Sequence, residues 1–151
     1  MTVLADTSVW VEYLRRGKGS KSARLDDLLV VGEVSVCGPV VAELLAGAKA
    51  ADRGRLWLLL TGLPWADLGP VQWQSVGETA ARLRERGEAV ALTDIEIAVA
   101  AVDSSSRLWT RDSDFKRIRG VLPALQFFDP LPLLDRCAAT ASRSRIASRF
   151  E

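Results

Sequence analysis

Short apolar segments alternate with helical patterns along this chain of 151 residues, and this alternation constrains the fold more than any other feature. The apolar segments lie at residues 3–5, 34–37, 107–110 and 125–128. Short, mainly apolar segments of this kind are typical of parallel strands that are buried on both faces. Strands that alternate with helices favour an α/β fold with a mainly parallel sheet.

Capping residues, glycine and proline mark the ends of the predicted helices. Thr7 or Ser8 is expected to cap a helix that ends at Gly17, and a second helical pattern covers residues 20–31. Later helices are predicted at residues 38–47, 52–60, 70–86 and 93–102.

One domain is expected over residues 1–135. Residues 136–151 are rich in Ser, Ala and Arg, and we expect a poorly ordered tail there, with an RNA contact as the alternative. The sequence shows no secretion-signal pattern and no apolar run of the roughly 18 residues that cross a membrane. These features predict a cytoplasmic protein without membrane contact.

The chain contains no histidine, which removes several classes of active site at once. Ser-His-Asp and Cys-His nucleophile systems and every histidine-containing metal site are excluded. The two cysteines, Cys37 and Cys137, lack the spacing of a zinc ribbon or a dithiol redox site, and Cys37 is expected in the core. A net charge of +1 does not by itself point to a polyanionic or polycationic partner. The chemistry must therefore depend on carboxylates, hydroxyls, lysine or arginine.

Four acidic residues lie where a carboxylate is costly to place. Asp6 and Asp112 follow predicted strands, Asp94 begins the most apolar helix, and Glu43 lies within an apolar helix. In a parallel sheet the carboxyl ends of the strands share one edge, where ligands bind. Two carboxylates about 4 Å apart repel by about 4 kcal/mol at an effective dielectric constant of 20. A hard divalent cation, which prefers oxygen ligands, would relieve this repulsion.

Each of these acids also has a purely structural alternative. Asp6 and Asp112 can act as helix caps, and an exposed polar stripe on its helix can explain Glu43. Thr93 and Glu96 have the spacing of a capping box, which favours a capping role for Glu96 over metal binding. A similar choice applies to Asp114, because an acid in a turn often bonds to its own backbone.

Four segments carry these acids, in the order LADTSVWVEYLR, VVAELLAG, LTDIEIAVAA and LWTRDSDF. Taken together over about residues 2–130, they resemble the PIN-domain ribonucleases, and in particular the VapC-type toxins of bacterial toxin–antitoxin pairs. The resemblance implies a three-layer α/β/α sandwich. It also implies a metal-dependent endoribonuclease, usually a homodimer, whose acidic pocket is blocked by a cognate antitoxin.

The resemblance further implies which residues hold the metal. Asp6, Glu43, Asp94 and Asp112 would bind one or two Mg²⁺ or Mn²⁺ ions, and a metal-activated water would hydrolyse the RNA phosphodiester bond. Asp112 is favoured over Asp114 for the fourth position. Side chains with supporting roles would be those of Thr7, Ser8, Thr110, Asp114 and Glu96, although the hydroxyls can equally cap helices or close strands.

RNA binding requires positive charge near the acidic pocket, which a nearly neutral chain can still provide locally. The candidate RNA-binding residues are Arg15, Lys18, Arg86, Arg111 and Lys116. For each of them a solvated surface position is the alternative. Trp57, Trp65 and Trp73 are expected in the core or in a dimer contact rather than in base stacking.

Two other functions fit parts of the pattern. A carboxylate-based phosphatase would use Asp6 as nucleophile, but such chemistry often requires a second Asp two residues later, where this chain has Ser8. A non-catalytic RNA- or protein-binding domain of the same fold would use the acids only as caps.

Overall fold

A three-stranded parallel sheet forms the centre of the molecule in the computed structural model, which describes residues 1–16, 19 and 22–130. Strand β1 (Val3–Ala5) lies between β2 (Val34–Ser35) and β3 (Arg107–Trp109). Leu4 is paired with Ser35 on one side and with Leu108 on the other. The three residues of β1 are fully buried, as expected for a strand covered on both faces.

Isolated bridges extend the sheet beyond these strands. Val36 pairs with Trp65 at one edge, and Leu108 pairs with Phe127 at the other. The predicted strand at residues 125–128 is therefore reduced to a single bridge. Its two backbone bonds, from Leu108 N to Gln126 O and from Phe128 N to Leu108 O, are each 2.8 Å long.

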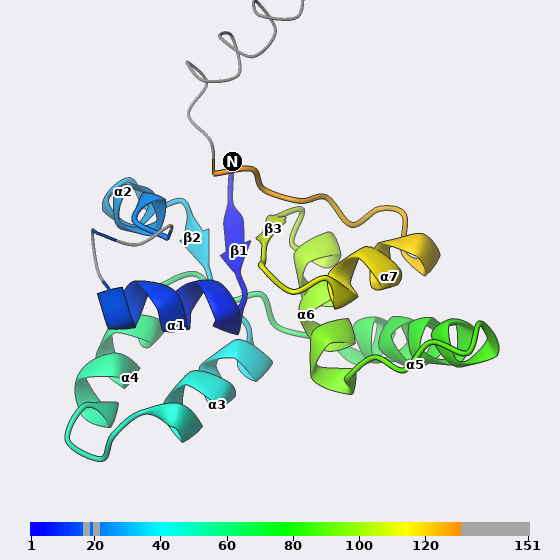
Figure 1. Ribbon diagram of the computed structural model, residues 1–151, viewed down its shortest axis with the longest axis horizontal. Helices are drawn as coiled ribbons and strands as arrows, with labels where there is room; N and C mark the ends of the chain where they lie inside the picture. The colour runs from blue at the N-terminus through cyan, green and yellow to red at the C-terminus, as the bar shows by residue number, and fades with distance from the viewer. Residues whose placement is uncertain (17–18, 20–21, 131–151) are drawn as a thin grey trace, which may run out of the picture.

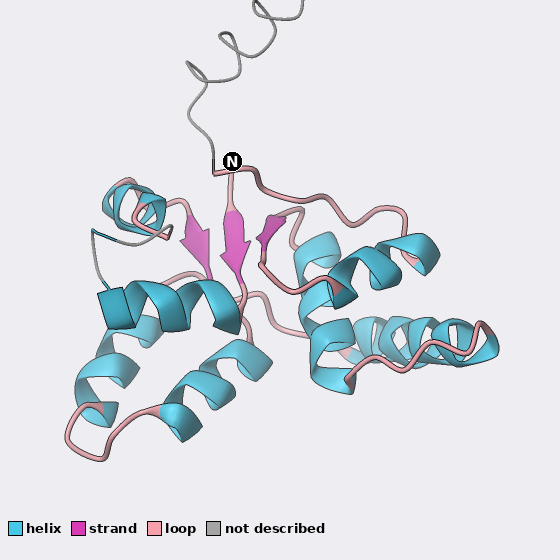
Figure 2. Ribbon diagram, viewed as in Figure 1, coloured by secondary structure: helices cyan, strands magenta, loops and turns pink. Residues whose placement is uncertain are grey.

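Seven helices flank the sheet in the described part of the chain. Figure 1 shows the first four on one side of the strands and the last three on the other. The first group is α1 (Thr7–Arg16), α2 (Arg24–Val30), α3 (Gly38–Gly47) and α4 (Arg53–Thr61). The second is α5 (Pro70–Glu85), α6 (Leu92–Asp103) and α7 (Asp114–Val121). The predicted three-layer α/β/α arrangement is confirmed (Figure 2).

Helix α6 is the central helix, as its apolar surface predicts. It packs against α3, α5, α7 and β3, and its residues from Ile97 to Ala101 are all buried. Gly87, with φ of +70°, follows the end of α5 and stops that helix where the sequence predicts. Cys37 is buried, as expected.

Several local predictions are wrong. Helix α1 is capped by Asp6, whose Oδ1 accepts a bond from Val9 N at 3.2 Å, and not by Thr7 or Ser8. Helix α2 begins at Arg24 after a turn at residues 22–23, and the predicted start at residue 20 lies outside the described residues. Helix α6 begins at Leu92, so Thr93 lies inside its first turn and forms no capping box with Glu96.

Helix α7 is not among the predicted elements. Its apolar residues Phe115, Ile118 and Val121 lie on one buried face, separated by three residues each, but the acidic turn before them obscured this pattern. The tryptophans Trp57, Trp65 and Trp73 are 46%, 37% and 50% exposed, so of the two positions expected for them the core is wrong and the dimer contact stays a prediction. Residue 135, the predicted domain boundary, lies outside the described residues.

The order of the strands places a ligand-binding crevice at one edge of the sheet. The chain passes from β1 to β2 on one side and then crosses to β3 on the other side of β1. Crevices form at the carboxyl ends of strands where the chain changes direction in this way. Residues that follow β1 and β3 therefore meet at the crevice. Among the described helices none is long and apolar enough to cross a membrane.

Shortening a side chain in the sheet should destabilise the whole domain. Leu108 is fully buried between β1 and the bridge at Phe127. Leu108→Ala is expected to lower the free energy of unfolding by about 2–5 kcal/mol, because it removes apolar contacts and leaves a cavity. Urea denaturation measures the change. The matched Leu58→Ala variant, at a position 73% exposed, should stay within about 0.5 kcal/mol of the original chain.

Candidate functional site

Asp6 lies at the carboxyl end of β1 and joins that strand to the end of β3. Its backbone N–H donates to Trp109 O at 2.9 Å. Its carboxylate accepts bonds from Ser8 Oγ at 2.5 Å and from Thr110 Oγ1 at 2.5 Å. The residue is 4% exposed, and this burial raises the pKa of the carboxyl even though the hydrogen bonds act to lower it.

The hydroxyl of Thr110 connects Asp6 to the turn that carries Asp112 and Asp114. The hydroxyl of Thr110, which donates to Asp6, accepts a bond from Asp112 N at 2.9 Å. The Oδ1 atom of Asp112 accepts a bond from Asp114 N, also at 2.9 Å. This last bond is the turn contact that short acidic side chains form with the backbone two residues later. The turn before α7 is therefore held in place by the buried Asp6.

Three carboxylates meet at this point. Asp94 from the first turn of α6, Asp112 from the turn and Asp114 from α7 each offer an oxygen atom, and these atoms lie within 4.8 Å of one another. Asp114 also forms an ion pair with Arg117, at 3.4 Å. The sequence favours Asp112 over Asp114 as the fourth acid, and the structure brings both to the cluster.

The electrostatics of Asp94 show that the predicted acids share one region. Burial raises its pKa to about 6, and the negative charges of Asp112, Glu43, Asp114 and Asp6 add to this effect in that order. An acid whose pKa is raised by its own neighbours is one that a cation would stabilise. The donor set, composed of carboxylate oxygens alone, fits a hard divalent ion.

Glu43 reaches this region from α3. Glu43 is exposed to solvent, but its carboxylate accepts a bond from Thr7 Oγ1 at the start of α1. Glu43 therefore faces the other acids and is not merely part of a solvated stripe. Glu96 is its neighbour: burial raises the pKa of Glu96, and the charge of Glu43 adds to the rise. Since the capping box is not formed, Glu96 joins the acidic region through Glu43.

The candidate RNA-binding residues are divided among different places. Arg15 and Arg111 line one cleft beside Asp6, together with Arg16. Lys116 is exposed on α7, and Lys18 lies outside the described residues. Arg86 Nη1 donates to Gly120 O at 3.2 Å, so this guanidinium packs against the carboxyl end of α7 rather than beside Asp6.

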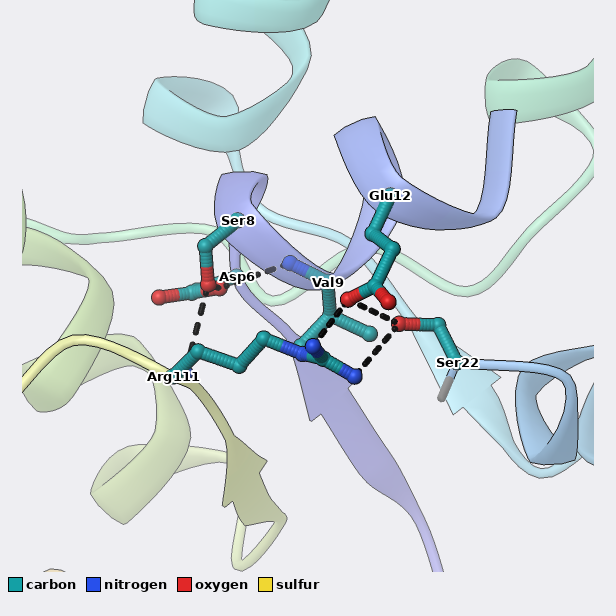
Figure 3. Close-up of polar contacts among 6 residues, drawn as sticks. All are labelled: Asp6, Ser8, Val9, Glu12, Ser22 and Arg111. Carbon is teal, nitrogen blue, oxygen red and sulfur yellow. Dashed lines mark hydrogen bonds and ion pairs between the residues drawn. The ribbon is translucent and has the colours of Figure 1, made fainter. Parts of the chain in front are cut away.

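Glu12 and Ser22 are residues that the sequence analysis missed. Glu12 forms an ion pair with Arg111, and Ser22 Oγ accepts a bond from Arg111 Nη2 at 3.3 Å (Figure 3). No local pattern predicts these contacts, because they join α1 to segments distant in the sequence. Glu12 is otherwise one of many acids on helix surfaces.

Comparisons with known proteins agree with this geometry. The family model of the PIN domain matches residues 3–121. Ribonuclease VapC32 of Mycobacterium tuberculosis is 34% identical over 115 residues, covering 76% of this chain and 87% of that protein. Ribonuclease VapC11 of the same species is 30% identical over 118 residues, covering 75% and 88%.

A solved structure supports the same fold. VapBC2 from Rickettsia felis, bound to a DNA fragment from its promoter, aligns with a TM-score of 0.67 and 23% identity over 85% of this chain and 98% of that one. The chain belongs to the PIN-domain family and, within it, to the VapC ribonucleases. The resemblance predicted from the four sequence segments is confirmed.

Removing the charge of Asp94 should stabilise the protein when no metal is bound. Its pKa is raised from 3.8 to about 6, so between these values the folded protein binds more protons than the unfolded chain. The free energy of unfolding therefore falls as the pH rises through this window. Because Asp94 is only half-buried, Asp94→Asn should raise the free energy of unfolding by only about 1 kcal/mol near pH 7.

Urea denaturation in EDTA tests this expectation. The difference in the free energy of unfolding between Asp94→Asn and the original chain should disappear below about pH 4, because Asp94 is then protonated and both side chains are uncharged. Asp67→Asn, at an exposed acid outside the acidic cluster, serves as the control and should change little. An Asp94→Asn variant that is less stable at neutral pH would contradict the assignment of repulsion to this residue.

Proposed function

We propose that this protein is a metal-dependent endoribonuclease and the toxin component of a toxin–antitoxin pair. The observation that carries the proposal is the meeting of Asp94, Asp112 and Asp114 at the carboxyl end of the sheet, in a chain of the VapC ribonuclease family. The raised pKa of Asp94 supports a cation at this point. A cytoplasmic location fits an enzyme whose substrate is RNA.

We propose Mg²⁺ or Mn²⁺ as the metal, with Asp6, Glu43, Asp94 and Asp112 as its ligands and catalytic residues. Asp114 supports this set and can replace Asp112 as the fourth ligand, because both reach the cluster. Glu96 contributes negative charge beside Glu43. A bound divalent ion lowers the pKa of a water ligand and offsets charge on the phosphate.

The hydroxyl groups orient the carboxylates. Ser8 and Thr110 each donate to one oxygen of Asp6, and Thr7 donates to Glu43. A donated bond fixes the direction of a carboxylate and leaves its other lone pairs for a cation. Thr7, Ser8 and Thr110 are therefore proposed as residues that position the acids, in addition to their local role at strand ends and helix starts.

The partners proposed are an RNA substrate, a cognate antitoxin protein and a second copy of the chain in a homodimer. Arg15, Arg111 and Lys116 are proposed to contact the RNA backbone. Trp57, Leu58 and Trp65 form an exposed apolar surface at α4, where the two indole rings lie 6.3 Å apart. An apolar surface of this kind supports protein contacts by the toxin, because large exposed side chains are typical of interfaces.

The two alternative functions are less well supported. A phosphatase would need Asp6 as nucleophile, often with a second Asp two residues later, but Ser8 occupies that position and its hydroxyl donates to the Asp6 carboxylate. A non-catalytic domain would need the acids only as caps. Glu43 and Asp94 accept no capping bond among the described residues, yet both contribute to one negative region.

Cleavage of intact total RNA by the purified protein tests the proposed activity. We expect cuts at defined sites in Mg²⁺, located by sequencing of the 5′ ends, and no cuts in EDTA. Asp94→Asn should reduce the rate by about 100-fold or more, because it removes a metal ligand. Asp67→Asn is the matched control and should keep full activity. Equal cutting by Asp94→Asn would contradict the proposal.

The affinity for the metal should depend on pH with a known sign. Protons compete with the cation for Asp94, whose pKa is raised to about 6. Mg²⁺ binding should therefore weaken as the pH falls through about 6, and it should release protons when measured near that pH. Isothermal titration in two buffers of different ionisation enthalpy measures both effects. Affinity that does not change between about pH 5 and pH 7 would exclude Asp94 as a ligand.

A further inference from the structure

A cleft lies against α1 next to Asp6. Its volume is about 550 Å³, and its lining residues are Ser8, Val11, Glu12, Arg15, Arg16 and Arg111. Three of these side chains are positive and one is negative, so the cleft carries a net positive charge. Ser8 belongs both to the lining and to the contacts of Asp6. The positive cleft is therefore continuous with the acidic region.

Arg111 is held in this cleft by two side chains. Its Nη1 atom forms an ion pair with Glu12, and its Nη2 atom donates to Ser22 Oγ at 3.3 Å. Ser22 is fully buried, and its hydroxyl also donates to Glu12 Oε2 at 3.4 Å. Figure 3 shows the guanidinium extending between Glu12 and Ser22, away from the carboxylate of Asp6.

The side chain of Arg111 points away from the acidic region, although its backbone lies next to that region. Its backbone N–H donates to Ser8 Oγ at 3.2 Å, and its neighbour in sequence is Asp112. Arginine pairs strongly with carboxylates, and Asp112, which directly follows Arg111 in the chain, belongs to the acidic cluster with Asp94 and Asp114. An ion pair with any of them would place a guanidinium where a cation is expected. The ion pair with Glu12 instead holds the guanidinium of Arg111 in the cleft, away from these acids.

We propose that the cleft of Arg15, Arg16 and Arg111 binds a backbone phosphate of the RNA strand next to the phosphate that is cleaved, and that Glu12 is the positioning residue that keeps Arg111 there. This inference rests on the proposed ribonuclease function. It adds a phosphate subsite and assigns a role to an acid outside the proposed metal ligands.

The chemistry of the cleft favours phosphate as the ligand. A guanidinium presents a planar set of N–H donors that matches two phosphate oxygens, and Glu12 and Ser22 fix the plane for Arg111. Contacts to phosphates orient a nucleic acid without reading its bases. Bound in this cleft, one phosphate would fix the strand so that its neighbour lies at the acidic cluster.

The dependence of RNA binding on salt tests the subsite. Fluorescence anisotropy with a labelled single-stranded RNA oligonucleotide would be measured in Mg²⁺, with Asp94→Asn in every protein to prevent cleavage. Adding Arg15→Gln and Arg16→Gln should reduce the slope of log affinity against log salt by about 0.7 for each lost phosphate contact. Arg84→Gln, at an exposed arginine on α5, is the matched control and should leave the slope unchanged.

Kinetics of the active protein give a second measurement of the same subsite. Arg15→Gln with Arg16→Gln should raise KM several-fold with little change in kcat, because a contact made equally in the ground and transition states is removed. Unchanged slopes and unchanged KM would overturn the subsite. Loss of binding to the antitoxin with RNA binding intact would overturn it as well and assign the cleft to the protein partner.

The positioning role of Glu12 is tested by metal binding without RNA. Mn²⁺ binding is measured by electron paramagnetic resonance. Glu12→Gln should weaken the affinity roughly tenfold, because the released Arg111 pairs with the acids. Glu12→Gln combined with Arg111→Gln should restore it. A purely structural role of the ion pair predicts no such recovery, so a double variant that stays weak, or a Glu12→Gln variant that binds normally, would overturn the role.

Measurements on the original protein distinguish failure of the proposed ribonuclease function from failure of the phosphate subsite. In the first case the original protein would bind no Mn²⁺ and cut no RNA, and the inference about Glu12 would fall with it. If the original protein binds Mn²⁺ and cuts RNA while the variants behave as the control does, only the further inference fails.

Discussion

The buried carboxylate of Asp6 connects the parts of the site to one another. It caps α1 through Val9, accepts a bond from Thr110 at the end of β3, and thereby orders the turn that carries Asp112 and Asp114. A buried charge must be compensated by hydrogen bonds, so these contacts are necessary to the fold as well as to the site. One residue thus links helix, sheet and acidic cluster.

Gathering acids around Asp94 forms the site but lowers the stability of the folded chain when no metal is bound. Burial, together with the negative charges of the neighbouring acids, raises the pKa of Asp94 to about 6, so the ionised carboxylate is unfavourable in the folded chain without metal. Such strain persists only if the surrounding structure enforces it. Here the buried residues of α6 and the fully buried strand β1 provide that enforcement. A cation turns the same arrangement from unfavourable to favourable.

The sequence predicts the fold, and the meeting of Asp94 with Asp112, because both depend on patterns within short segments. The apolar run of residues 3–5 predicts β1, and the acids after strands predict the crevice at their carboxyl ends. Contacts between distant segments could not be predicted in this way. The ion pair of Glu12 with Arg111 depends on how α1 meets the end of β3, and no pattern in either segment contains it.

Local rules also failed where two explanations competed for one residue. Thr93 and Glu96 match a capping box, but α6 begins at Leu92 after Ala91, so Thr93 lies inside the first turn and cannot act as the cap. Asp6 had both a capping and a site explanation, and both describe its contacts. A capping residue and a residue of the acidic region need not be alternatives.

The shortness of helix α7 limits the lifetime of the assembled acidic cluster. It contains eight residues, and Asp114 begins it while Asp112 bonds to its first backbone N–H. Helices of this length are not stable alone and open locally more often than the core unfolds. One such opening would withdraw Asp114 from the cluster and break the bond that orders the side chain of Asp112. The packing of Phe115, Ile118 and Val121 therefore governs how long an assembled cluster survives between openings of α7.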